Sequence, residues 1–150
     1  MKHRWAALGL VLALSAFVAS SAPAQTAGQA GQSRGSGALG QNFPNPFNPE
    51  TTIPFDVGMA GDPPACADTG KLYRVSIRIY NVLMQLVSIP ILQGGGGRPV
   101  ANLQLSCGQY KAFWDGRVVG TSREAASGVY VYTLEIDGRN AGVKRMIVVK

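Results

Sequence analysis

The residues of this chain that could do chemistry are mainly its carboxylates. Paired carboxylates can hydrolyse a glycosidic bond when they face one groove at the right separation. Most of the acidic residues here stand at turns or beside glycine and proline, where carboxylates usually cap backbone amides or are solvated. Asp115, in the run Trp114-Asp115-Gly116, is expected to accept hydrogen bonds from turn amides. We therefore expect no catalytic pair among Glu50, Asp56, Asp62, Asp68, Asp115, Glu124, Glu135 and Asp137.

Other groups that support catalysis or metal binding are scarce. The only histidine is His3, near the amino terminus. No serine or cysteine nucleophile therefore has a histidine partner in the body of the chain, and the commonest metal ligand is missing there. No calcium-loop motif occurs, although Asp62 and Asp68 leave weak cation binding open. We predict no enzyme activity, no cofactor and no metal site.

The two cysteines, Cys66 and Cys107, are 41 residues apart. In an exported chain such a pair indicates a disulfide rather than a redox or zinc site. Closing this loop would contribute about 3–4 kcal/mol in the chain-entropy description. The alternative is two separate buried thiols, because the sequence does not show whether the two Cα atoms approach each other.

The amino terminus indicates export. Lys2 and Arg4 begin a short positive region, an apolar run follows from Trp5 to Val18, and Ala22-Pro23-Ala24 is a small-residue cleavage pattern. These features together define a secretory signal peptide over residues 1–24. An uncleaved membrane anchor is the alternative, but spanning a bilayer takes about 20 apolar residues.

Cleavage after Ala24 would leave 126 of the 150 residues, enough for one domain. Of the 14 basic residues it would remove Lys2 and Arg4, which leaves 12 against 8 acidic residues and a net charge of +4. No run of positive residues is present, so nucleic-acid binding is not indicated.

Residues 25–41 are rich in Gly, Ser, Gln and Ala, and this composition predicts a flexible linker. The linker contains a formal G-x-G-x-x-G match at Gly35–Gly40. We discard it as a nucleotide site because no preceding strand or following helix is predicted. From Asn42 to Pro49 the sequence alternates prolines with asparagines and two aromatic residues. Proline stiffens this segment, and Phe43 and Phe47 are both expected to pin it onto the domain.

The rest of the chain has the pattern of short strands separated by turns. The clearest are residues 73–80, which alternate strictly between apolar and polar side chains, and residues 128–136. Asp137-Gly138 is a hairpin turn signal, and residues 143–149 complete that pair. Pro90 interrupts the apolar run 86–92 and indicates a strand end or a sheet edge. About seven such strands and no helical period predict an all-β sandwich over residues 42–150.

Three tyrosines of these strands, Tyr80, Tyr130 and Tyr132, suggest two alternatives. They could share an exposed face, as in a carbohydrate-binding platform. The interpretation we favour is that strand aromatics pack in the core of the sandwich.

Several blocks of the sequence resemble one known domain. They are QNFPNPFNPETTIPFDV at residues 41–57, IYN at 79–81, FWDG at 113–116, SGVYVYTLE at 127–135 and the closing KRMIVVK. These blocks resemble the C-terminal sorting domain of the type IX (Por) secretion system. That domain is similar to the immunoglobulin-like domain of the flagellar hook-capping protein FlgD. The segment Asn42-Phe43-Pro44-Asn45-Pro46-Phe47-Asn48-Pro49 is the most specific block.

The resemblance implies a seven-stranded immunoglobulin-like sandwich without enzyme activity. Such a domain carries a passenger across the outer membrane, is recognised there by the secretion machinery, and places the protein at the cell surface or outside the cell. The closing strand, with Lys144, Arg145 and Lys150, is part of what such proteins present. A last strand at a sheet edge could be offered to a receptor by strand pairing.

Three departures from the family pattern stand out. The turn after Asn81 lacks the usual glycine, and Met84 occupies a position that favours a positive φ. The segment around Pro63–Cys66 is longer than usual, so a Cys66–Cys107 bridge would be a local addition. A large passenger normally precedes such a domain, whereas only the linker stands before this one.

Two other functions remain open. The first is a structural or assembly module similar to hook capping, although a cleavable signal peptide argues against flagellar export. The second is a secreted carbohydrate-binding module that uses the tyrosines. No small-molecule substrate is indicated by either.

Overall fold

A computed structural model describes residues 36–150. The predicted signal peptide, residues 1–24, and residues 25–35 of the predicted linker lie outside this range. The described chain is built from strands alone, and none of its residues is helical. Its elements are β1 (Gly37–Leu39), β2 (Thr51–Val57), β3 (Met59–Ala60), β4 (Ala65–Cys66), β5 (Leu72–Tyr80), β6 (Leu86–Ser88), β7 (Ile91–Leu92), β8 (Leu103–Ser106), β9 (Gly108–Trp114), β10 (Gly128–Ile136) and β11 (Arg139–Val148).

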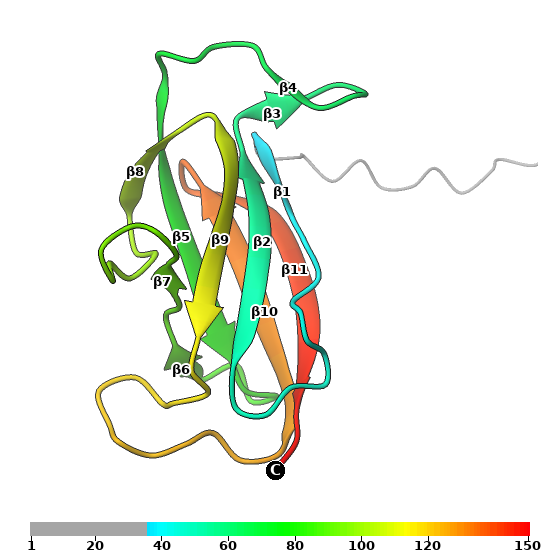
Figure 1. Cartoon of the computed structure of the whole chain (residues 1–150), viewed down its shortest axis with the longest axis vertical. Coiled ribbons are helices and arrows are strands. Elements are labelled where there is room, and N and C mark those ends of the chain that lie inside the picture. The colour runs from blue at the N-terminus through cyan, green and yellow to red at the C-terminus, as the bar shows by residue number, and fades with distance from the viewer. Residues whose placement is uncertain (1–35) are drawn as a thin grey trace, which may run out of the picture. The chain divides into compact units, whose positions relative to one another are not determined.

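The strands form two packed antiparallel sheets (Figure 1). One sheet has the order β1-β2-β9-β7, and the other has the order β11-β10-β5-β6, with β8 also paired to β5. A separate hairpin, β3–β4, extends from one end of the domain (Figure 1). This confirms the predicted all-β sandwich. Within residues 36–150 the strands number eleven rather than about seven, because irregular stretches form additional pairings two or three residues long.

The core lies between the two sheets and follows the predicted alternation of β5 and β10. Side chains of β5 and β10 that point inward meet inward side chains of β2 and β9, and this removes a large apolar area from water. The buried residues of these four strands include Val75, Ile77, Ile79, Tyr132, Leu134, Ile136, Ile53, Phe55, Ala112 and Trp114.

The β10–β11 hairpin is confirmed at the predicted turn. Asp137 and Gly138 both have positive φ, 52° and 77°, which is the backbone that a two-residue turn needs to match the twist of its strands. Strand β10 pairs with β11 along its whole length and with β5 on its other side. The hairpin therefore places β11 at the edge of its sheet.

The predicted linker differs from the structure from residue 37 onward. Gly37–Leu39 forms β1 and pairs with β2, and Leu39 is buried against the core. Glycine is needed at Gly37 because a Cβ atom there would overlap the carbonyl of Asp56 and the side chain of Ile136. The composition of this segment is that of a linker, but its glycines permit a close backbone approach that composition does not reveal.

Candidate recognition surface

The acidic side chains mainly hold turns and ion pairs. Asp115 Oδ1 accepts a hydrogen bond from the backbone N–H of Arg117 at 3.0 Å, which confirms the role predicted for it. Asp137 Oδ1 accepts the Arg74 N–H at 2.9 Å, and Glu135 forms an ion pair with Arg78 at 3.2 Å. Within residues 36–150, no three His, Cys, Asp or Glu side chains cluster in a way that could hold a metal ion.

The tyrosines do not form an exposed platform. Tyr130 and Tyr132 are buried, and the Tyr130 hydroxyl donates to the carbonyl of Ala126 at 2.8 Å. Tyr132 donates to the carbonyl of Gly40 and accepts the N–H of Asn42, both at 2.9 Å. The interpretation of core packing is confirmed for these two residues, and a carbohydrate platform that uses them is wrong.

The Asn42–Pro49 segment is anchored mainly by Asn42 and Phe47. Asn42 is buried, and its Nδ2 donates to the carbonyl of Pro44 at 3.0 Å and to Thr51 Oγ1 at 2.9 Å. Phe47 is buried edge-on against Trp114, with ring centroids 5.5 Å apart. Phe43 instead leaves 78% of its surface exposed, so the prediction that both phenylalanines pin the segment is wrong for Phe43. Only its backbone is held, by two hydrogen bonds to Thr52.

The Trp114-Asp115-Gly116 block packs against the same segment. Trp114 is buried between Phe47 and Tyr130, and its Nε1 donates to the carbonyl of Arg117 at 2.9 Å. Gly116 has a φ of 75°, and a Cβ atom there would overlap the carbonyl oxygen of Pro49. Two sequence blocks that lie far apart in the chain are therefore in direct contact.

The outer edge of β11 is occupied by the segment that leads from β1 to β2 (Figure 1). Gln41 Nε2 donates to the carbonyl of Arg145 at 2.9 Å, and Asn45 Oδ1 accepts the N–H of Ile147 at 2.9 Å. Phe47 forms a parallel bridge here, donating to the carbonyl of Ile147 and accepting the N–H of Val149, both at 3.0 Å. Strand β11 thus lies at a sheet edge, as predicted, but much of its backbone there is already paired.

The three basic residues predicted for recognition are not clustered. Lys144 and Arg145 are adjacent in β11, so their side chains lie on opposite faces of the sheet. Arg145 is exposed and Lys144 is half-buried. Lys150, beyond the end of β11, forms an ion pair with Glu124 at 3.2 Å. Arg145 is therefore the basic residue of this set that faces solvent without an ion pair among residues 36–150.

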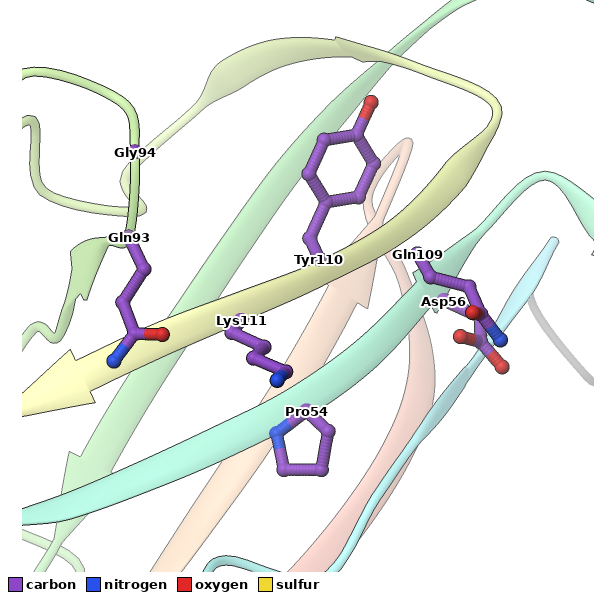
Figure 2. Close-up of a pocket in the computed structure, with 7 residues that line it drawn as sticks. All are labelled: Pro54, Asp56, Gln93, Gly94, Gln109, Tyr110 and Lys111. Carbon is purple, nitrogen blue, oxygen red and sulfur yellow. The ribbon is translucent and has the colours of Figure 1, made fainter.

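An open groove of about 520 Å³ crosses the outer face of the β2–β9 pair (Figure 2). It offers one carboxylate, one ammonium group and two side-chain amides. The ring of Tyr110 turns away from these polar groups (Figure 2), and its hydroxyl donates to the carbonyl of Ser106 at 2.9 Å. The sequence did not indicate this groove, because its lining combines residues of β2 and β9 with the loop after β7, which lie far apart in the sequence. The lining residues are Pro54, Asp56, Gln93, Gly94, Gln109, Tyr110 and Lys111.

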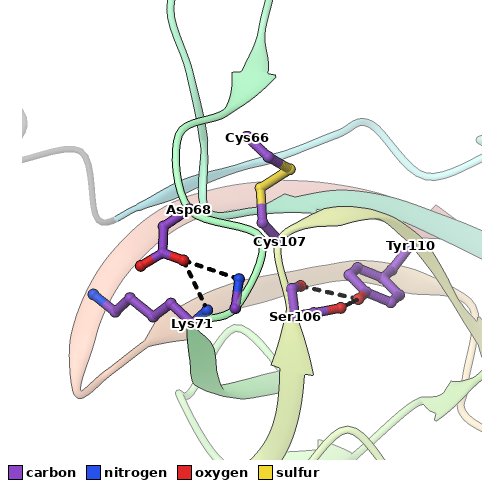
Figure 3. The surroundings of a disulfide bond; sticks show 7 residues. Cys66, Asp68, Lys71, Ser106, Cys107 and Tyr110 are labelled. Atoms are coloured by element: carbon purple, nitrogen blue, oxygen red, sulfur yellow. Dashed lines mark hydrogen bonds between the residues drawn. A yellow bond between two sulfur atoms is a disulfide. The ribbon is translucent and has the colours of Figure 1, made fainter.

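The predicted disulfide is confirmed. Cys66 and Cys107 are bonded, with their Cα atoms 5.8 Å apart, and the bond ties β4 to the start of β9 (Figure 3). Beside it, Asp68 Oδ1 accepts the N–H groups of Gly70 and Lys71. The bridge therefore fastens the long β3–β4 excursion, which has few core residues of its own, to the sandwich.

The turn after β5 has the backbone that the sequence suggested. Met84 has a φ of 59°, in the left-handed region where glycine is the usual residue. The side chain of Asn81 organises this turn, because its Oδ1 accepts the N–H groups of Leu83 and Gln85, both at 3.0 Å.

Within residues 36–150, no helix has the length and apolar character needed to cross a bilayer. No family model matches the chain, and no curated protein matches it. Among solved structures, the chain is similar to Pseudomonas fluorescens alkylpurine DNA glycosylase AlkC bound to DNA containing an abasic site analog, with 10% sequence identity and a TM-score of 0.47. The match covers 77% of this chain and 31% of that chain. At this level of similarity the match carries no argument about function.

Proposed function

We propose that this chain is a non-catalytic, exported immunoglobulin-like domain of the sorting type. In this proposal the secretion machinery of the outer membrane recognises the domain, and recognition leads to translocation or display at the cell surface. The proposal rests on the resemblance of the sequence blocks at residues 41–57, 79–81, 113–116, 127–135 and 144–150 to type IX sorting domains.

The observation that carries this proposal is that these blocks assemble around one another. Phe47 packs on Trp114, the carbonyl of Pro49 lies against Gly116, and Asn45 binds the backbone of Ile147 across 102 residues of sequence. Residue types that are specific to the family pattern thus have structural tasks that depend on each other. This supports treating the blocks as parts of one domain pattern.

The Cys66–Cys107 disulfide is compatible with an exported protein, because disulfides persist in oxidising compartments such as the periplasm and the cell surface. Recognition through β11 is expected to use its outward side chains. The backbone edge is largely paired with Gln41, Asn45 and Phe47, so a receptor strand would have to displace them. Arg145 is the basic side chain best placed for such a contact.

The test is to insert a reporter enzyme between Ala24, the end of the predicted signal peptide, and Gln25. The fusion is expressed in a host with a type IX system and in a matched strain that lacks it. We expect reporter activity outside the outer membrane only in the first host. Equal periplasmic retention in both hosts would overturn the proposal. Retained protein that also self-associates would favour an assembly module instead.

A pair of charge reversals examines the contact itself. Arg145→Glu is expected to reduce export, whereas Arg123→Glu, a change of equal charge in an exposed loop, is expected to leave it intact. Neither arginine forms an ion pair among the described residues, so both variants should fold. Equal export of the two variants would remove Arg145 from the recognition surface.

A further inference from the structure

The turn between β5 and β6 presents three consecutive apolar side chains to solvent. Val82, Leu83 and Met84 leave 71%, 74% and 61% of their surfaces exposed. Leu86, at the start of β6, is also exposed. We refer to these four residues as the apolar tip. A run of exposed apolar residues lowers solubility unless it meets a partner.

Hydrogen bonds within the turn hold the backbone of the apolar tip in place. The Met84 N–H donates to the carbonyl of Asn81 at 3.0 Å, and the Asn81 N–H donates to the carbonyl of Gln85 at 3.1 Å. Asn81 Oδ1 accepts the N–H groups of Leu83 and Gln85, and its Nδ2 donates to Gln85 Oε1 at 2.8 Å. The polar side chains thus bind each other and the backbone, while the apolar ones remain outside.

We propose that the apolar tip inserts into the interface of a lipid bilayer. A chain segment that enters a bilayer needs hydrogen-bond acceptors for its backbone N–H groups within the protein, because the lipid chains offer none. Four of the five amides from Asn81 to Gln85 meet this requirement, and the exception is the N–H of Val82. This pattern favours shallow insertion at the level of the headgroups, where water still reaches the Val82 N–H. The same pairing makes the turn a poor template for strand addition, which requires free amides.

The position of the tip and the residue at its base fit a membrane surface. The tip lies at the end of the domain opposite the β3–β4 hairpin, where β5 ends (Figure 1). Tyr80, at its base, is the amphipathic residue type that concentrates at bilayer interfaces.

The inference is independent of the sorting role, and its test uses the processed protein recovered after export. Vesicles of phosphatidylcholine, with and without phosphatidylglycerol, are prepared with brominated acyl chains. In the Leu83→Trp variant we expect a blue shift and bromine quenching of the new fluorescence, above the background of buried Trp114. In the matched Val143→Trp variant, on the outer face of β11, we expect neither. Because the signal reports residue 83, binding through the amino-terminal segment does not imitate it.

Vesicle binding of unlabelled variants provides the second measurement. Removing the Leu83 side chain from the interface should weaken binding about tenfold or more, so Leu83→Ser is expected to show that loss. Val143 is also an exposed apolar residue. The vesicle affinity of Val143→Ser is expected to stay within about twofold of that of the parent. Thermal unfolding midpoints of both variants confirm that they are folded.

Three results would overturn the proposal. The first is a parent protein that binds neither type of vesicle, including the case in which the tip instead mediates self-association. The second is binding that Leu83→Ser leaves unchanged. The third is equal quenching at positions 83 and 143, which would show that the tip has no special place in the contact.

Discussion

The hydroxyl of Tyr132, in the middle of β10, accepts a hydrogen bond from the backbone N–H of Asn42 at 2.9 Å. The same hydroxyl donates to the carbonyl of Gly40. This contact joins the core to the start of the segment that covers the edge of β11. Three further pairs in this region, Phe47 with Trp114, Pro49 with Gly116 and Asn45 with Ile147, extend the connection.

Tyr132 is expected to make stability depend on pH in the alkaline range. Burial raises the pKa of Tyr132 from 10.0 to about 12, and the hydrogen bond from Asn42 opposes that rise. The folded protein keeps the proton where the unfolded chain loses it, so the stabilisation is complete below pH 10. It is lost as the pH rises from about 10 to about 12, by about 3 kcal/mol in total.

Urea unfolding at several pH values, for the parent and for Tyr132→Phe, measures this effect. The variant should lack this part of the alkaline slope. At neutral pH it should be less stable by about 1–3 kcal/mol, because the buried Asn42 N–H loses its acceptor. Parallel pH curves for the two proteins would contradict the assignment.

Phe47 and Phe43 should differ sharply in their effect on stability. Phe47→Ala removes a buried ring from its contact with Trp114 and is expected to cost about 3–5 kcal/mol. Phe43→Ala removes an exposed ring and should change the free energy of unfolding by no more than about 0.5 kcal/mol. Chemical denaturation of both variants checks this, and similar losses would show that the ring of Phe43 is packed.

Gly116→Ala and Gly138→Ala form a matched pair. Both glycines have positive φ, 75° and 77°, so each alanine carries a backbone cost of about 1–2 kcal/mol. At Gly138 the new methyl group meets open space, whereas at Gly116 it overlaps the carbonyl oxygen of Pro49. Gly116→Ala should therefore be the more destabilising change. Equal losses of unfolding free energy would mean that the Asn42–Pro49 segment shifts at little cost to make room for the new methyl group.

The side chain of Asn45 should protect one backbone amide of β11. Asn45→Ala removes the acceptor of the Ile147 N–H and is expected to cost about 0.5–1.5 kcal/mol. Hydrogen exchange at the Ile147 amide should become faster, while amides in the middle of β10 keep their protection. Asn48→Ala, a change of an exposed side chain in the same segment, serves as the control. Unchanged exchange at Ile147 would show that the edge is held by Phe47 alone.

The disulfide should contribute about 3–4 kcal/mol, as expected for a closed loop of this length. Urea unfolding with and without a reducing agent, compared with the Cys66→Ala/Cys107→Ala double variant, measures the contribution. The reduced parent and the double variant should agree. If reduction leaves the urea midpoint of unfolding unchanged, other contacts hold the β3–β4 hairpin to the sandwich.

Features that arise from neighbouring residues could be predicted from the amino-acid sequence. Strict alternation predicted the buried face of β5, and Asp137-Gly138 predicted the hairpin that follows β10. Pro90 separates β6 from β7 as expected, because proline cannot donate to a ladder. The family resemblance pointed to Met84 as a position where glycine is usual, and its φ is positive.

Features that depend on residues distant in sequence could not be predicted and became visible only in the folded domain. The strand character of Gly37–Leu39 depends on β2, and the choice of Phe47 rather than Phe43 as the anchor depends on the position of Trp114. The covering of the β11 edge joins residues about a hundred positions apart, such as Asn45 and Ile147. Such pairings leave no periodic signal in either segment, because each backbone group needs only one partner and the chain can bring it from anywhere.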